Sequence, residues 1–331
     1  MRPATPAAAR TGLLIACLIA SPAALALMAG TPPDSPAARI LGAERTTEWS
    51  GAGEVITPAG RFGGVAVGAA LVLTAAHVAA GFVDTPGQLR FAAGTGGANG
   101  AIPITRIAVM PGYRLPANDL ALLTLARPLP GSVARYALLE RPLQVGDLLE
   151  FVGAGRSGHG DTGVSGPSTP GLFRHGQNVV DLVGERIPGV ALRGHYFLYD
   201  FDGPAGDGPT GRGTLGNGLE TLVAGGDSGS PVFVRDATGA VRLAGINTVV
   251  IGAAEGRPPA FRFGDLGAGT DLTAAPVAAW LAHASDGAIR RGGNAKSRIG
   301  ERIRVALAAI GALLIAAVTI SHRQANPPRH A

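Results

Sequence analysis

The chain has 331 residues, of which 51 are glycine and 25 are proline, and only 15% are charged. Frequent glycine and proline with few charges exclude a coiled coil or a mainly helical bundle, and the lack of a Gly-x-y period excludes collagen. The net charge is +5, but residues 40–281 carry 17 Arg, no Lys and 20 acidic residues. The basic excess lies outside this span, so we expect no nucleic-acid partner.

The N-terminal segment is typical of a secretory signal peptide. A basic start is followed by a short apolar stretch, and Ala24-Leu25-Ala26 offers a cleavage site of small residues. We expect a signal peptide over residues 1–29 and a short pro-segment over residues 30–39, which places the protein in the cell envelope or periplasm. An uncleaved anchor and a lipidated Cys17 are the alternatives. Cys17 is the only cysteine, so no disulfide forms within the chain.

Residues 40–283 contain short apolar stretches of strand length, each bounded by glycine, proline or other turn residues. This spacing predicts an all-β domain of the antiparallel sandwich or barrel type. The stretches are 64–73, 102–110, 120–125, 148–152, 179–183, 232–234 and 241–251. Residues 272–283 contain few such breakers, and we expect one packed helix there.

The C-terminal segment combines positive charge with an apolar run. Residues 284–302 form a basic linker, and residues 305–320 are uncharged. As a helix this run spans about 24 Å, short of a ~30 Å bilayer core, but flanking arginines can extend it by snorkelling. We expect a transmembrane helix over residues 303–321 and a short tail over residues 322–331. The basic linker conflicts with the positive-inside rule if the domain is exported, and a buried or amphipathic helix is the alternative.

Three short motifs contain the residue types that nucleophilic catalysis uses. Residues 71–77 form an apolar stretch that ends at His77, Asp119 precedes a very apolar stretch, and residues 225–231 read Gly-Gly-Asp-Ser-Gly-Ser-Pro around Ser228. Each motif alone has a structural explanation, namely a core histidine, a turn aspartate or a tight turn. The order His, Asp, Ser at separations of 42 and 109 residues is much more specific.

With these motifs in this order, residues 40–283 resemble the trypsin-like (chymotrypsin-fold) serine endopeptidases. Residues 153–156 resemble the Gly-Trp-Gly turn of the family with the Trp lost. Residues 199–202 and Glu220 resemble exported bacterial members with a C-terminal membrane segment. The resemblance implies two packed antiparallel six-stranded β-barrels with a C-terminal helix, here followed by the separate transmembrane helix. It also implies a serine endopeptidase that acts on proteins or peptides, needs no cofactor and is a monomer.

The resemblance assigns the catalytic roles residue by residue. Ser228 corresponds to the nucleophile, His77 to the general base and acid, and Asp119 to the residue that orients the imidazole. The backbone N–H groups of Gly226 and Ser228 correspond to the oxyanion hole. A catalytically silent binding module on the same fold is the main alternative, and an esterase is a weaker one.

Activation and specificity residues also follow from the resemblance. Cleavage after Arg39 would free the α-amino group of Ile40, which would then pair with Asp227. The alternative is that residues 39–42 form only an early strand and that backbone donors hold Asp227. The expected substrate-binding residues have small or apolar side chains, which favours small apolar P1 residues, and they are Leu222, Thr248 and Val250.

Two pairs of potential metal ligands stand apart from these motifs. His159 and Asp161 have no partner at metal-ligand spacing, so we expect a loop there. Asp200 and Asp202 alternate along an apolar stretch, which fits either a calcium site or a solvated strand edge. We expect the solvated edge, and thus no metal site.

Overall fold

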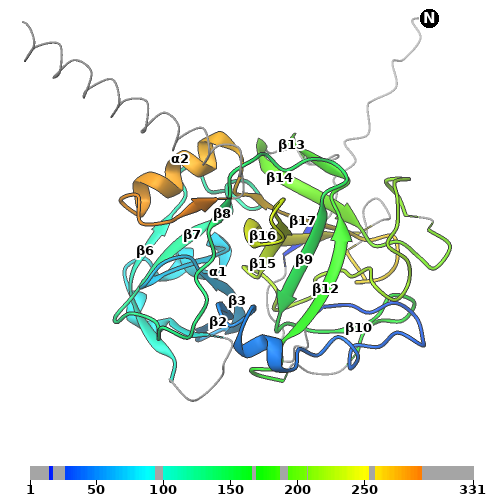
Figure 1. The fold of residues 1–331 in the computed structure, drawn as a ribbon, viewed down its shortest axis with the longest axis horizontal. Helices are drawn as coiled ribbons and strands as arrows, with labels where there is room; N and C mark the ends of the chain where they lie inside the picture. The colour runs from blue at the N-terminus through cyan, green and yellow to red at the C-terminus, as the bar shows by residue number, and fades with distance from the viewer. Residues whose placement is uncertain are drawn as a thin grey trace, which may run out of the picture.

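The computed structural model describes residues 15–17, 27–93, 100–165, 169–186, 193–206, 208–252 and 258–292. Within these ranges the chain is mostly β-structure and forms two halves side by side (Figure 1). The expected transmembrane helix over residues 303–321 and most of the expected signal peptide lie outside the described residues. None of the helices in the described part of the chain is long and apolar enough to cross a membrane.

The first half is a closed six-stranded antiparallel barrel in the order β2-β3-β4-β7-β6-β5. Its strands are β2 (Ala52–Thr57), β3 (Gly60–Ala66), β4 (Leu71–Thr74), β5 (Arg90–Ala93), β6 (Ile102–Val109) and β7 (Ala121–Leu125). The most apolar strands, β4 and β7, pair with each other through Leu73 and Leu122. Both leucines are buried in one apolar cluster with the other strands, because a closed barrel leaves its inner face no solvent.

Short helical segments fill the connections of the first half. They are η1 (Ala43–Thr46), α1 (Ala76–Ala79), η2 (Ala80–Phe82) and η3 (Pro86–Gln88). Pro86 lies in the first turn of η3, where its missing N–H costs no helical hydrogen bond. The strand β4 leads directly into α1, so this first turn after the barrel strand brings His77 to the boundary between the halves.

The second half is a ten-stranded sheet whose main path runs β12-β9-β15-β16-β17-β14-β13. These strands are β9 (Leu148–Gly153), β12 (Arg174–Val179), β13 (Leu182–Arg186), β14 (Arg193–Asp200), β15 (Pro231–Arg235), β16 (Val241–Ile251) and β17 (Leu266–Asp271). In the described residues β12 and β13 end this path without pairing with each other. The expected all-β class is therefore seen, but of the two expected six-stranded barrels only the first is closed.

The long strand β16 extends past the end of β15, and this leaves one of its edges open to further strands. There β1 (Ile15–Cys17) pairs antiparallel with residues 249–251. On the other edge of β16, ahead of its pairing with β17, β8 (Leu138–Leu139) pairs parallel at Leu243. A small two-stranded sheet is formed by β10 (Gly158–His159) and β11 (Gly163–Val164).

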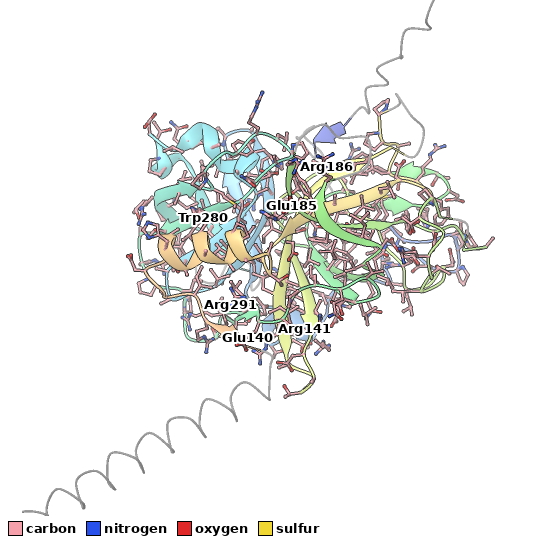
Figure 2. The ribbon with its side chains drawn as sticks, turned by 90° about the horizontal axis from the view of Figure 1, so that it is seen from above. Glu140, Arg141, Glu185, Arg186, Trp280 and Arg291 are labelled. Atoms are coloured by element: carbon pink, nitrogen blue, oxygen red, sulfur yellow. The ribbon has the colours of Figure 1, made fainter. Side chains whose placement is uncertain are left out.

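The C-terminal helix α2 (Ala275–Ala284) lies over the first barrel, where Val277 and Leu281 are fully buried and Trp280 packs partly against the same core (Figure 2). After α2 the chain pairs with β8 through β18 (Arg291–Gly292), beside Glu140 in Figure 2. The linker expected from residue 284 is thus partly folded, because its residues up to 292 pack and hydrogen-bond on the domain.

The folded domain begins earlier than residue 40, which the sequence analysis took as its start. Leu27, Met28 and Ala29 are completely buried. Residues 30–39, expected as a short pro-segment, lie on the second half, with Ile40 bridged to Arg174 of β12. The apolar side chains of Leu27 and Met28 are buried in the core of the second half, so residues 27–39 pack with the domain.

Candidate active site

The two halves bring together three side chains that are far apart in sequence. His77 Nδ1 lies 2.7 Å from Asp119 Oδ2, and His77 Nε2 lies 2.7 Å from Ser228 Oγ. The backbone N–H of His77 also donates to Asp119 Oδ1 at 2.8 Å. Because a carboxylate only accepts, it holds the proton on Nδ1 and leaves Nε2 to accept from the Ser228 hydroxyl.

Local sequence explains how His77 and Asp119 come so close. The residues around His77 are small or apolar, and Ala76, Val78 and Ala79 of α1 are buried, so the short helix packs on the barrel. Asp119 follows Asn118, which has a left-handed φ of 52° that asparagine tolerates. The turn therefore aims the Asp119 carboxylate back toward α1 before β7 begins.

Glycines allow the loop of Ser228 to pack directly on the first barrel. The Ser228 carbonyl accepts the N–H of Gly63 in β3 at 2.8 Å. Gly229 has a φ of +81°, and a Cβ there would collide with Thr74 Oγ1 and the Gly63 carbonyl. The loop thus bridges the two halves, and only glycine fits at these contacts.

The trypsin family model matches residues 44–170 of the chain. The chain carries a trypsin-like, chymotrypsin-fold serine protease domain. The matched segment contains His77 and Asp119, and the structure extends the domain to the loop of Ser228. A comparison with curated proteins found no match.

The expected oxyanion-hole residues lie on the same loop of the trypsin-like domain. Gly226 has a φ of +95°, a left-handed value that a residue with a side chain would adopt only with strain. Ser228 is completely buried beneath His77. The oxyanion role of the Gly226 and Ser228 N–H groups stays a prediction.

Asp227 is the buried anchor of this loop in the trypsin-like domain. Its side chain accepts N–H groups from Gly155 at 2.8 Å, Ala224 at 3.0 Å and Leu27 at 3.2 Å. Burial raises the pKa of Asp227, and these backbone donors act against the rise. The turn at residues 153–156 therefore needs its glycines, because a Cβ at Gly153 or Gly155 would collide with the Asp227 carboxylate.

Residues 27–30 occupy a closely fitted channel beside Asp227. The N–H of Met28 donates to the Leu222 carbonyl at 2.8 Å, and the Thr221 hydroxyl donates to the Met28 carbonyl. Further along, the Gly30 carbonyl lies 2.8 Å from His159 Nδ1. Sequence reasoning missed the contact between the Leu27 N–H and Asp227, although the cleavage motif at residues 24–26 ends immediately before Leu27.

The residues expected to form the activation site lie elsewhere in this structure. The N–H of Ile40 donates to the Ala37 carbonyl, and Asp227 is in contact with Leu27 instead. Arg39 is buried, pairs with Asp34 and donates to the carbonyls of Leu219 and Glu220. Arg39 thus fastens the N-terminal segment to the second half.

The expected substrate-binding residues Leu222, Thr248 and Val250 are all buried. Leu222 and Val250 pack in one apolar cluster with Tyr199. The Tyr199 ring lies against Gly267, which pairs with Val250 across β16 and β17. An aromatic ring thus fills space beside both strands.

The edge of β16 next to these residues already holds an extended chain segment. Ile15, Ala16 and Cys17 of β1 pair antiparallel with Ile251, Val250 and Val249. This edge can therefore accept an added strand through main-chain hydrogen bonds.

Asp200 and Asp202 do not form a solvated strand edge. Both are only 3% exposed, and Glu220 joins them with 2% exposure. One ligand oxygen of each lies within 4.8 Å of the others. The expectation of a solvated edge is wrong because the loop before Glu220 folds over these carboxylates, so three potential metal ligands meet in the interior.

Proposed function

We propose that this protein is an active serine endopeptidase that cleaves peptide bonds through an acyl-enzyme intermediate. The observation that carries the proposal is the chain of two 2.7 Å contacts from Asp119 through His77 to Ser228. A serine hydroxyl is a weak nucleophile unless a neighbouring base takes its proton. The buried carboxylate keeps the imidazole in the tautomer that can do so.

In the first half-reaction, Ser228 Oγ attacks the carbonyl carbon of the scissile bond and its proton passes to His77 Nε2. The N–H groups of Gly226 and Ser228 stabilise the oxyanion, each such donor contributing about 3–4 kcal/mol to the transition state. The C–N bond then breaks, and His77 returns the proton to the leaving amine. Water repeats the sequence on the ester, with the His77 imidazole as base, and releases the acid.

We propose that the activating N-terminus is Leu27 rather than Ile40. The backbone nitrogen of Leu27 lies 3.2 Å from Asp227 Oδ2, so cleavage after Ala26 would convert this N–H into an ammonium group beside a fully buried carboxylate. A buried charge needs such a partner. Removal of a signal peptide at Ala24-Leu25-Ala26 during export would then also activate the chain.

Two further expectations remain proposals. Packing of the Tyr199 ring with Leu222 and Val250 supports a preference for small P1 side chains. Export to the cell envelope is supported by the position of Leu27 directly after the cleavage motif. Anchoring by residues 303–321 rests on the sequence.

Turnover of casein and of a peptide library tests the activity. A chain released to begin at Leu27 should cleave peptides, and its Ser228→Ala variant should not. Absence of turnover in the folded, Leu27-starting chain would favour a catalytically silent binding module.

A matched pair of chains tests the activation step. One begins at Leu27 and the other carries a single extra glycine before it, which displaces the α-amino group from Asp227. We expect the extension to reduce kcat/KM by at least about a hundredfold, because a small misplacement of the Ser228 loop is enough for such a loss. Equal activity of the two chains would contradict the assignment of Leu27.

A further inference from the structure

A cluster of acidic side chains lies inside the second half, away from His77 and Ser228. Asp200 ends β14, Asp202 follows two residues later, and Glu220 returns from the loop between β14 and the segment that leads to Ser228. The three carboxylates are buried, and one oxygen of each lies within 4.8 Å of the others. Oxygens that share one Ca²⁺ at 2.3–2.6 Å lie at most about 5 Å apart, so the spacing suits a single ion.

Asp202 is the residue that points to a missing ligand. Both of its carboxylate oxygens are buried, and neither has a hydrogen-bond partner among the described residues. Its neighbours are satisfied: Asp200 accepts from the N–H and hydroxyl of Thr210, and Glu220 accepts from Thr214. A buried carboxylate with no donor carries a large desolvation cost unless a cation or proton compensates it.

Positive charge is also lacking around the cluster. In the described ranges, none of the three carboxylates forms an ion pair with a basic side chain. A fourth buried acid, Asp181, accepts the N–H of Asp200. Arg39 lies near, but it donates to the backbone carbonyl of Glu220 and pairs with Asp34.

The loop that covers the cluster is shaped around the carboxylates. A Cβ at Gly208 would collide with oxygens of both Asp200 and Asp202. The N–H of Leu215 donates to Glu220 Oε2, and Glu220 Oε1 accepts the N–H of Asp202. The two arms of the loop therefore meet at the carboxylates, as expected for a segment wrapped around an ion.

We propose that Asp200, Asp202 and Glu220 bind a divalent cation, and that the cation is Ca²⁺. All three ligands are carboxylate oxygens, and no histidine or cysteine belongs to the cluster, which disfavours zinc. Their irregular arrangement suits Ca²⁺, which accepts flexible geometry, better than Mg²⁺, which requires a near-octahedral site and retains water. The ion would lie in the interior and offset the charge on Asp202.

The position of Glu220 links this site to the rest of the domain. The next residues, Thr221 and Leu222, hold the backbone of Met28. An ion at Glu220 would thus fix the segment that receives residues 27–30 and continues to Ser228. Any effect of the ion on activity rests on the proposed function, whereas binding of the ion does not.

Calcium titration of a catalytically inactive chain tests the site directly. The full chain carrying Ser228→Ala is treated with EDTA, dialysed and titrated with CaCl₂, with binding followed by calorimetry and stability by thermal unfolding. We expect one Ca²⁺ per chain and a rise in Tm of roughly 5–10 °C at a hundredfold excess over Kd. MgCl₂ should give a much smaller rise.

Two variants test whether the calcium response comes from this cluster or from another acidic residue. Asp202→Asn should abolish the calcium response, while its Tm without calcium should equal or exceed that of the parent, because a buried charge is removed. Asp161→Asn, at an exposed acid in the same half, should respond like the parent. If Asp202→Asn fails to fold, Glu220→Gln takes its place with the same expectation. No binding by the parent, or an unchanged response in the cluster variant, would overturn the proposal.

Discussion

The two halves of the molecule accommodate buried charge in different ways. In the first barrel the buried carboxylates have partners supplied by the barrel itself: Glu54 pairs with Arg61, and Asp119 pairs with His77. In the second half, Glu150 and Asp236 also have ion pairs, but other buried carboxylates have none in the described part of the chain, among them Asp181, Asp200, Asp202, Glu220 and Asp227.

This difference indicates that the first barrel itself supplies the partners of its buried carboxylates. The second half, by contrast, needs positive charge from a free N-terminus and a metal ion. Asp227 has no ion pair among the described residues, although the charge of Arg174 acts on it from a greater distance, and a free amino group at Leu27 would supply a direct partner. A metal ion would supply a positive charge to Asp202. The proposed nucleophile, Ser228, belongs to the second half, whereas His77 and Asp119 belong to the first. Activity is therefore expected to depend on whether the second half has received its free amino group and its metal ion.

The largest effect, on kcat, is expected at the residues of the first half that contact Ser228. Asp119→Asn should lower kcat by about 10⁴-fold, because an amide in place of the carboxylate favours the wrong imidazole tautomer. The free energy of unfolding should change much less. Asp84→Asn, at an exposed acid of the same half, is the control and should leave kcat unchanged. A loss of kcat of less than tenfold for Asp119→Asn would show that catalysis does not depend on the contact between Asp119 and His77.

The next largest effect, on the free energy of unfolding, is expected at Asp227 in the second half. Asp227→Asn should lower the free energy of unfolding of a chain that begins at Leu27 by about 3 kcal/mol, since it leaves a buried ammonium without its partner. In the chain extended by one glycine the loss should be smaller, because the ammonium group is displaced. Denaturant unfolding of the four chains gives the coupling energy. A coupling near zero would mean that Leu27 and Asp227 do not form an ion pair.

A smaller effect is expected at a carboxylate of the second half that already has partners. Burial alone would raise the pKa of Asp236, but hydrogen bonds from Thr238, Ala240 and Arg242 lower it from 3.8 to about 2. A lowered carboxyl pKa gives stability that is present above pH 4 and is lost as the pH falls toward 2. We expect about 1–2 kcal/mol after allowance for screening.

Urea unfolding between pH 5 and pH 2 measures this contribution. The wild-type protein should lose it over that range, and Asp236→Asn should be less stable at pH 5 and show a shallower loss. Parallel curves for the two proteins would show that Asp236 does not contribute to acid sensitivity.

The smallest effect compares one buried tyrosine from each half. Tyr199→Phe removes a 3.3 Å hydrogen bond to Asn247, and Tyr136→Phe in the first half removes a 2.8 Å bond to the Glu48 carbonyl. Each should cost about 1 kcal/mol of unfolding free energy. Only Tyr199→Phe should also change KM for substrates with small P1 residues, which steady-state kinetics would detect. Equal KM values would remove Tyr199 from the specificity site.

Much of the first barrel and of the candidate site could be predicted from the sequence. The barrel strands are apolar runs with clear breakers, and the motifs around His77, Asp119 and Ser228 are local patterns in a specific order. Proximity of the three followed from the family resemblance, because it depends on packing between residues 151 positions apart.

The rest depends on long-range contacts that local patterns do not encode. The N–H of Leu27 meets a carboxylate 200 residues away, so Arg39-Ile40 was the more visible candidate for an activation site. Burial of Asp200 and Asp202 depends on a loop that returns 18 residues later with Glu220. Closure of a second barrel would require pairing between β12 and β13, which lie at opposite ends of the sheet path in the described residues, and local patterns do not encode such pairing.

Labelling with a fluorophosphonate probe tests the central claim most directly, because the probe reacts with a serine whose hydroxyl has been activated by a base. For the chain that begins at Leu27, we predict one label per molecule on Ser228, found by peptide mass spectrometry, and no label in the folded His77→Ala variant. Absence of labelling under conditions that fully label a control serine protease, or a label that survives loss of His77, would contradict the account.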